Sequence, residues 1–160
     1  MTISIRQARL PADEPAILSF IAGLQDYEAV FEPDRRRDAG YVVEHWREVQ
    51  HRCAERHGIF LLAEEDEKPV GWAFAHDVPG HLFVVEEERR HGSLAELYVV
   101  PQARGRGHGR GLIAGCEAWA LERGHKLLTV GVLSGNARAI RSYEGAGYLP
   151  YTLILRRYLS

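Results

Sequence analysis

The glycines and arginines of residues 104–110 are the part of the sequence best suited to bind a charged ligand. They read Arg-Gly-Arg-Gly-His-Gly-Arg and follow an apolar stretch, residues 94–100, that ends at a proline. After them, apolar residues recur at helical spacing from Leu112 to Ala120. The loop is therefore expected to join a strand to the N-terminus of a helix.

A loop of this kind is suited to binding an anion. The first N–H groups of a helix have no partner inside it and carry partial positive charge. Glycines allow a ligand to approach the backbone closely. Arg104, Arg106 and Arg110 are expected to add positive charge around the same point. A phosphate or pyrophosphate fits such a loop, although a glycine-rich connection that only turns the chain remains the alternative.

Two common phosphate-binding motifs do not fit this loop. A P-loop needs Lys-Ser or Lys-Thr after its last glycine, and neither pair is present. A dinucleotide-binding motif needs Gly-x-Gly-x-x-Gly. Its last position is Arg110 when the count starts at Gly105, and Leu112 when it starts at Gly107, so the motif fails in both frames.

Glu96 is a candidate general base. A charge inside an apolar strand is costly unless it has a partner or a task. Strand alternation places Glu96 on one face with Tyr98 and Val100, opposite Leu97 and Val99. A glutamate at a solvated strand end, or one in a structural ion pair, is the alternative and stays open.

The length of 160 residues predicts one domain over residues 1–160, and the composition argues against two kinds of partner. The chain has 20 Lys and Arg against 22 Asp and Glu, whereas a dedicated nucleic-acid binder is usually basic. RNA binding by the Arg-Gly run is disfavoured further because the run is short and lacks interleaved aromatic residues. No apolar run has the length of a membrane span, so no membrane partner is expected.

The cysteines and histidines predict neither a metal site nor a disulfide. Cys53 and Cys116 both fall on apolar faces of expected helices, as small core residues of a protein in a reducing cytoplasm do. No Cys or His pair has zinc-ligand spacing. The N-terminus lacks the long apolar core of a signal peptide, so a cytoplasmic location is expected. His45, on an apolar helical stripe, is expected to be packed and hydrogen-bonded rather than catalytic.

The order of elements predicts a mixed α/β sheet of α+β type, with hairpins in the first half and strand–helix–strand crossovers in the second. Ligands in such sheets favour the carboxyl ends of strands. The expected strands are residues 3–8, 59–63, 70–75, 81–85, 94–100, 127–132 and a last strand or strand pair at 148 and 151–155. The expected helices start after Asp13, run over 38–56, follow the glycine loop, and run over 137–144 behind an Asn136 cap.

Two motifs resemble those of the GCN5-related N-acetyltransferases, the GNAT family. The glycine loop is similar to that family's Gln/Arg-x-x-Gly-x-Gly/Ala loop. Residues 136–148 resemble its Asn-x-x-Ala-x-x-x-Tyr-x-x-x-Gly-Phe segment, with Tyr148 in place of phenylalanine. The opening Ile-x-Ile-Arg-x-Ala also fits. The resemblance implies a central mixed sheet of six or seven strands flanked by about four helices.

The resemblance also implies an activity: an acetyl group moves from acetyl-CoA to a primary amine by direct attack in a ternary complex, without a metal. Asn136 would lie near the thioester. Tyr143 would protonate the departing sulfur, unless it is only a core aromatic, and Glu96 matches the base of some members. The implied acetyl-CoA contacts are the backbones of Leu97, Tyr98 and Val99 for the pantetheine arm, and those of Arg104, Gly105, Arg106, Gly107, His108 and Gly109 for the pyrophosphate.

The resemblance implies a small-molecule or protein amine as the acceptor, and the family places the acceptor site on the first two helices and the loop between them. Tyr27, Glu28 and Tyr98 are the candidate acceptor contacts. Carboxylates there suit a cationic amine, whereas the arginines of residues 35–37 suit a substrate with its own carboxylate. Many relatives form homodimers, so a homodimer is compatible with the resemblance. A catalytically inactive acyl-CoA-binding sensor or scaffold is the alternative function.

Overall fold

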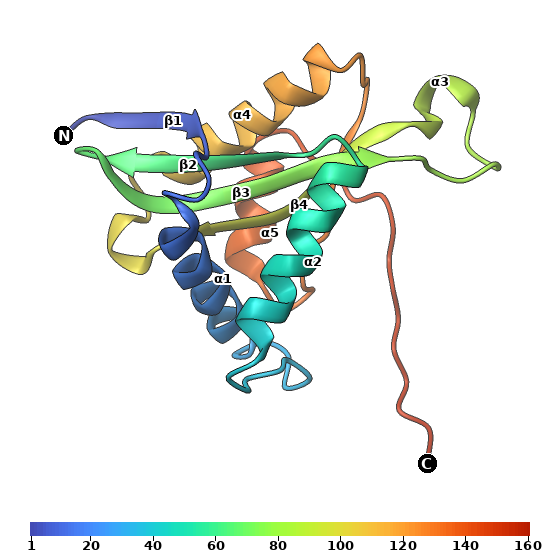
Figure 1. The fold of residues 1–160 in the computed structure, drawn as a ribbon. Coiled ribbons are helices and arrows are strands. Elements are labelled where there is room, and N and C mark those ends of the chain that lie inside the picture. The colour runs from blue at the N-terminus through green and yellow to red at the C-terminus, as the bar shows by residue number, and fades with distance from the viewer.

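A computed structural model describes residues 1–160 and contains one five-stranded sheet between helices (Figure 1). The strands lie in the order β1-β2-β3-β4-β5, so the fold is the mixed α/β, α+β-like class expected from the sequence. The strands are β1 Ile3–Gln7, β2 Ile59–Glu65, β3 Lys68–Val78, β4 His91–Val99 and β5 Leu128–Val130. The helices are α1 Glu14–Glu28, α2 Tyr41–Glu55, α3 Glu86–Arg89, the 3-10 turn η1 Pro101–Ala103, α4 His108–Glu122 and α5 Ala137–Gly145.

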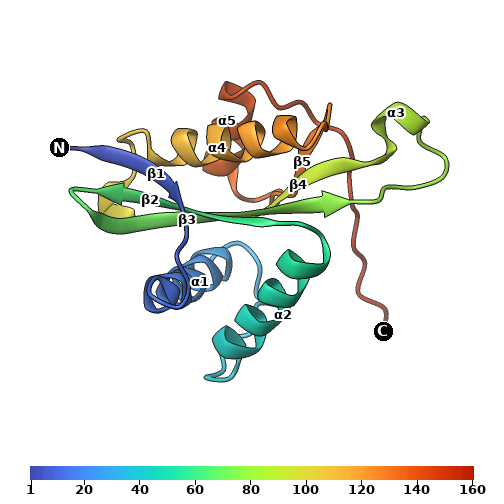
Figure 2. The same cartoon turned by 45° about the horizontal axis from the view of Figure 1, so that its top comes forward.

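The two faces of the sheet carry separate apolar cores. Helices α1 and α2 cover one face, and α4 and α5 cover the other (Figure 2). Alternation along the central strands divides the side chains between them: Trp72 and Phe74 pack toward α1 and α2, and Ala73 and Ala75 toward α4. The small residues on the α4 side let that helix lie close to the sheet.

The sheet opens between β4 and β5. The first four strands are antiparallel neighbours, whereas β5 runs parallel to β4 and pairs with it only from Gly92 to Leu94. Beyond Leu94 the edge of β4 has no neighbouring strand on that side. This opening is the main feature of the fold that positions a site.

A β-bulge at Ala95 decides which side chains face the opening. Phe74 pairs with Glu96 and Ala75 pairs with Leu94, which leaves Ala95 as the extra residue. Leu94 therefore joins the α4-side core together with Leu97, despite their odd spacing in sequence. The bulge does not disturb the segment after it, so Glu96 and Tyr98 share a face as expected.

The expected strand at residues 81–85 is absent. Strands β3 and β4 already pair with each other as far as Val78 and His91, so the segment between them has no strand edge to join. It forms a projecting turn that leads into the short helix α3 (Figure 1). Arg89 closes the turn, because its guanidinium donates hydrogen bonds to the carbonyls of Leu82 and Val84.

The expected last strand at residues 148 and 151–155 is also absent, so the sheet has five strands rather than six or seven. No regular structure follows α5, and the chain runs away from the body as an extended tail (Figure 1). The strand expected at 127–132 is shortened to β5, and the helix expected at 38–56 becomes α2, Tyr41–Glu55. A strand forms only where a neighbour accepts its hydrogen bonds, and β5 offers only a short edge.

Candidate functional site

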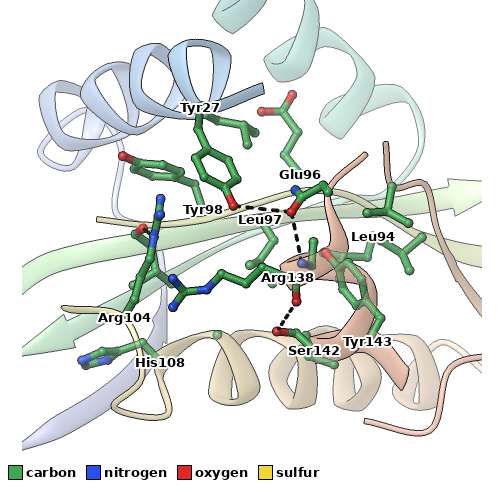
Figure 3. Close-up of a pocket in the computed structure, with 18 of the residues that line it drawn as sticks. Tyr27, Leu94, Glu96, Leu97, Tyr98, Arg104, His108, Arg138, Ser142 and Tyr143 are labelled. Atoms are coloured by element: carbon green, nitrogen blue, oxygen red, sulfur yellow. Dashed lines mark hydrogen bonds between the residues drawn. The ribbon is translucent and has the colours of Figure 1, made fainter. Parts of the chain in front are cut away.

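One cavity of about 540 Å³ lies at the opening of the sheet (Figure 3). This volume is in the range of small-molecule sites. Its walls come from the end of α1, the second half of β4, the glycine loop with the start of α4, and α5. It brings together every candidate residue named from the sequence except Arg106, namely Tyr27, Glu28, Glu96, Leu97, Tyr98, Val99, Arg104, Gly105, Gly107, His108, Gly109, Asn136 and Tyr143.

The glycine loop presents a row of free backbone donors. The N–H groups from Gly105 to Arg110 donate to no protein acceptor, and the first helical bond of α4 runs from Gly111 to the Gly107 carbonyl. Gly105 and Gly107 have φ of +78° and +97°, which L side chains rarely adopt. No other atom lies within 4 Å of where a Cβ would stand at either position. Free donors, helix polarity and open space together fit a diphosphate.

The arginines of the loop do not all converge on that point, contrary to the expectation. Arg104 donates from Nε to the Val99 carbonyl at 2.8 Å, and its guanidinium lies over the Tyr27 ring, 4.6 Å from the centre. Arg106 pairs with Glu65 at 2.5 Å and does not line the cavity. Arg110 does line it.

A cation that the sequence interpretation missed is Arg138 of α5, which also lines the cavity (Figure 3). The position of Arg138 in the sequence could have indicated a role in binding an anion. It stands in the first turn of α5, where the helix dipole disfavours positive charge and an anionic ligand would compensate.

His108 holds the glycine loop from behind. Its side chain is fully buried, and Nε2 lies 2.8 Å from a carboxylate oxygen of Glu65 on β2. Hydrogen bonding from His108, helped by the charge of Arg106, lowers the pKa of Glu65. The first turn of α4 is therefore fixed to β2 by side chains that leave the backbone donors free.

The open edge of β4 offers the peptide groups of Leu97 and Val99. The Val100 N–H donates to the Val70 carbonyl of the neighbouring segment, so alternation points the Tyr98 peptide toward β3 as well and the two others toward the opening. The Val99 carbonyl is already occupied by Arg104. Of the three backbones expected to hold a pantetheine arm, Leu97 is thus the freest, whereas the Tyr98 peptide faces β3 and only lines the cavity.

Asn136 links the two helical layers across the cavity. Its Oδ1 accepts a hydrogen bond from the Ala139 N–H at 3.1 Å, which caps α5 as expected. The same oxygen accepts a hydrogen bond from the Tyr27 hydroxyl at 3.4 Å (Figure 3). Tyr27 and Asn136 therefore form a bridge from α1 to α5.

Tyr143 points from α5 into the cavity toward Leu94 (Figure 3). Its ring packs edge-on against Tyr148, with centres 5.8 Å apart, and contacts the α4-side core. Burial raises the pKa of Tyr143 to about 12, so the phenol keeps its proton at neutral pH. The side chain is placed both to pack and to donate a hydrogen bond.

Glu96 points away from Tyr143 toward α2 (Figure 3), where its carboxylate is hydrogen-bonded to His45 Nε2. Burial alone would lower the pKa of His45, but hydrogen bonding and the charge of Glu96 outweigh it and raise that pKa. His45 also stacks on Tyr41, with ring centres 5.2 Å apart. His45 is thus packed and hydrogen-bonded as expected, but its partner is the candidate base.

A second, smaller cavity of about 150 Å³ adjoins the first at this pair. Tyr41 and His45 of α2 line it, and it shares Glu28, Glu96 and Ala95 with the main cavity. No sequence pattern indicated it, because α2 and β4 are far apart in the chain. The two cavities meet at the bulge of β4.

The charges expected to select an acceptor are largely paired. Glu28 forms an ion pair with Arg35 at 2.9 Å. Arg36 pairs with Asp38 and Glu44, and Arg37 pairs with Asp26, all of them exposed. The arginines of residues 35–37 are therefore paired with carboxylates. The two carboxylates that line both cavities are paired as well, Glu28 with Arg35 and Glu96 with His45.

No group of three or more His, Cys, Asp or Glu side chains is arranged to hold a metal ion. None of the helices combines the length and the apolar character that crossing a membrane requires.

The chain matches the Acetyltransferase (GNAT) family over residues 21–148. It is 33% identical over 121 residues to an uncharacterised N-acetyltransferase of Archaeoglobus fulgidus, covering 76% of this chain and 74% of that protein. A solved protein of Bacillus halodurans superposes with a TM-score of 0.83 at 19% identity over 98% of this chain and 99% of that one. AAC(6')-Iy, solved with the bisubstrate analogue CoA-S-monomethyl-acetylneamine, superposes with a TM-score of 0.70 at 18% identity over 100% of both chains. This protein belongs to the GNAT acetyltransferase family.

Proposed function

We propose that this protein transfers an acetyl group from acetyl-CoA to a primary amine, by direct attack of the amine in a ternary complex. One observation carries the proposal: the free donors of the glycine loop and the open edge of β4 border the same cavity. That cavity takes residues from Leu24 to Ala146, which supports a single catalytic domain over residues 1–160.

The donor's diphosphate would bind at the start of α4. The N–H groups from Gly105 to Arg110 supply hydrogen bonds without reorganisation, and Arg110 and Arg138 supply charge. Acetyl-CoA brings an activated acyl group with a thiolate leaving group. A neighbour of the same fold was solved with a CoA-containing bisubstrate analogue, which supports this choice of donor.

The pantetheine arm would lie in the opening beside β4. The Leu97 peptide faces that opening and can replace the strand partner that β5 does not provide. The amide groups of a pantetheine arm complement a strand edge in the same way as an added peptide does. This arrangement directs the acyl end toward Ala95 and Asn136.

Activation of the amine falls to Glu96. An alkylamine has a pKa of about 10.4, so neutralising it at pH 7 costs about 4–5 kcal/mol. Glu96, directly or through a water molecule, would take that proton. His45 holds the carboxylate in place from α2, and the smaller cavity gives the amine a route to it.

Tyr143 would donate a proton or a hydrogen bond to the departing sulfur. Its raised pKa keeps the phenol protonated at neutral pH, and its ring is held against Tyr148. The Glu96 side chain extends from β4 toward α2, whereas Tyr143 projects from α5, so the base and the acid would approach the acyl group from different sides (Figure 3). Tyr27, Glu28 and Tyr98 would contact a small-molecule or protein amine.

The test measures acetyl-CoA binding and turnover separately. Calorimetry with acetyl-CoA should show binding at the cavity, and a panel of polyamines, amino acids, aminoglycosides and amine-bearing peptides should release free CoA thiol above an amine-free blank. Binding without thiol release from any amine would identify an acyl-CoA sensor or scaffold instead. Absence of acetyl-CoA binding would overturn both.

A further inference from the structure

On the basis of the acetyl transfer proposed for this cavity, we infer that the acceptor is a primary amine that also carries a carboxylate several bonds away. The side chain of Arg104 would bind this carboxylate. Arg104 has the three properties that such a role requires: a fixed guanidinium, free hydrogen-bond donors, and a position beside the candidate acceptor contacts.

The guanidinium of Arg104 is held between two aromatic rings. Its central carbon lies 4.6 Å from the centre of the Tyr27 ring and 5.5 Å from the centre of the Tyr98 ring. Nε donates a hydrogen bond to the Val99 carbonyl at 2.8 Å, which fixes the direction in which the group points. The two cation–π contacts and this bond immobilise the side chain before a ligand arrives, so a ligand loses less affinity to ordering it.

Most of the hydrogen-bond donors of this guanidinium are free. An arginine has five side-chain N–H donors, and in Arg104 only the one on Nε has a protein acceptor. Arg106 of the same loop pairs with Glu65, whereas no carboxylate pairs with Arg104. The side chain is partly buried and lines the main cavity. Its two terminal nitrogens form the planar fork that matches the two oxygens of a carboxylate.

Arg104 lies on a different side of the sheet from Arg110 and Arg138. Its guanidinium extends from the loop toward Tyr98 and Tyr27, which pack against the core formed with α1 and α2 (Figure 3). Arg110 and Arg138 belong to α4 and α5, on the face where the glycine loop presents its free N–H groups. The diphosphate of the donor would therefore be matched by these two arginines, which leaves the Arg104 side chain for the acceptor.

The charges that line the main cavity disfavour an acceptor that is only cationic. Glu28 is paired with Arg35 and Glu96 with His45, whereas Arg104 has no such partner. A second ammonium group of the acceptor would be repelled near Arg104, and a carboxylate would be attracted there. The acceptor would therefore present its amine to Glu96 and its carboxylate to Arg104.

The geometry of β4 sets the separation between the amine and the carboxylate. Tyr98 follows Glu96 on the same face of the strand, two residues or about 6.6 Å further along. The Arg104 guanidinium lies against the Tyr98 ring, and the Glu96 carboxylate points away from that ring toward α2 (Figure 3). An α-amino acid, whose two groups share one carbon atom, is too short to reach both residues. An ω-amino acid or a short peptide with free ends has the required length.

The first experiment compares matched acceptors with the wild-type protein. Each pair consists of a carboxylate and its neutral carboxamide: γ-aminobutyrate, ε-aminocaproate, glycylglycine and, as the short pair, glycine, each with its amide. Thiol release from acetyl-CoA should give a kcat/KM about tenfold or more higher for the acid in at least one longer pair, and no such preference for glycine. The preferred pair distinguishes a free amino acid from a peptide terminus. Equal values in every longer pair, or an equal preference for glycine, overturn the inference.

The second experiment assigns the preference to the Arg104 side chain. Arg104→Gln should reduce the acid preference to within about twofold, while calorimetry shows an acetyl-CoA affinity within about twofold of the wild type. Arg104→Lys keeps the charge but not the fork, and it should retain part of the preference. Arg90→Gln removes an exposed charge outside the cavity and should behave as the wild type. A preference that persists in Arg104→Gln, or a loss of acetyl-CoA affinity in its place, overturns the assignment.

Equilibrium binding separates the failure of this inference from the failure of acetyl transfer. Saturation-transfer NMR, with and without CoA, measures binding of the same acids and amides to the wild type and to Arg104→Gln. If no amine releases thiol but an acid binds more tightly than its amide, and only to the wild type, the transfer is wrong and the carboxylate site stands. If thiol is released and neither binding nor kcat/KM favours any acid, the transfer stands and the carboxylate site is wrong.

Discussion

The hydrogen bond between Glu96 and His45 joins β4 to α2 beside the smaller cavity. Substitutions at these two residues test whether Glu96 is the general base. Glu96→Gln keeps the shape and a hydrogen bond but removes the ability to accept a proton. We expect the acidic limb of the kcat/KM profile to disappear and the rate at pH 7 to fall about a hundredfold. The exposed Glu86→Gln serves as the control. An unaltered profile would assign the proton to water or another residue.

His45 is a positioning residue in this scheme, and His45→Gln separates its charge from its hydrogen bond. Glu96 raises the pKa of His45, so the pair is charged over a wider pH range than a free histidine would be. Glutamine still donates to the carboxylate but stabilises its ionised form less. The acidic limb of the pH–rate profile should therefore move to higher pH, with the KM for acetyl-CoA nearly unchanged. A profile that does not move would limit His45 to packing against Tyr41.

Tyr143→Phe tests whether the Tyr143 hydroxyl acts as the general acid. The change removes one hydroxyl and leaves the packing against Tyr148, so acetyl-CoA should bind within about twofold of wild type while turnover falls about a hundredfold. Tyr148→Phe is a matched control, because the Tyr148 hydroxyl is buried without a hydrogen-bond partner and Tyr148 does not line the cavity. Rapid-quench turnover and calorimetry measure the two quantities. Equal turnover in both variants would leave Tyr143 as a core aromatic.

At the scale of elements, the glycine loop and the start of α4 form one unit. A substitution at Gly107 tests whether its backbone conformation is needed for acetyl-CoA binding. Gly107→Ala forces a side chain onto φ +97°, at a strain of about 1–2 kcal/mol, and should weaken acetyl-CoA binding about tenfold. Gly124→Ala is the matched control at the other end of α4: its φ is +78°, and it too has open space around the added Cβ. Both should lower Tm similarly, but only Gly107→Ala should affect binding. Equal affinities would mean that the loop does not hold the diphosphate.

The sequence predicted the elements whose signals are local. The strand, loop and helix around residues 94–120 and the Asn136 cap depend on neighbouring residues, and the structure has them. The strands expected at 81–85 and 151–155 are absent, because a strand forms only where the edge of a neighbouring strand is available. The sequence did not predict the bulge at Ala95, because the bulge arises from the pairing of β4 with β3.

The same distinction applies to the site. The free backbone N–H groups of the glycine loop were predicted from the residue types, whereas the directions of its side chains were not. Arg104 and Arg106 looked equivalent, yet one stacks on Tyr27 and the other pairs with Glu65. The pairing of Glu96 with His45 needed the packing of α2 against the sheet, which no local pattern contains.

At the scale of the molecule, the sheet separates the side that we propose binds the acyl donor from the side that we propose binds the acceptor. The α4 and α5 layer carries the glycine loop, Arg138 and Tyr143, and the α1 and α2 layer carries Glu28 and His45. The α4 layer is tied to the sheet at both ends. Glu65 holds its start, and Asp77 of β3 holds the segment just after its end through Arg123 and His125. The position of the glycine loop, the proposed diphosphate site, relative to Glu96 therefore depends on these ties.

The Asp77 tie gives a prediction about stability and pH. Burial alone would raise the pKa of Asp77, but hydrogen bonds from Arg123 at 2.5 Å and His125 at 2.8 Å outweigh it and lower that pKa to about 2. An unfolded aspartate titrates near 3.9, so the folded state gains about 2 kcal/mol above pH 4 and loses it as the pH falls toward 2.

Asp77→Asn should therefore lower the free energy of unfolding at pH 7 by about 2 kcal/mol or more, because it also leaves Arg123 without its carboxylate. Its loss of stability between pH 4 and pH 2 should be smaller than that of wild type, since the titrating group is gone. Urea denaturation at several pH values measures both effects, and the exposed Glu122→Gln on α4 is the control. If Asp77→Asn and wild type lose stability in parallel below pH 4, Asp77 does not hold α4 to the sheet through its charge, and the geometry of the donor site must be maintained by the apolar core and the Glu65 tie.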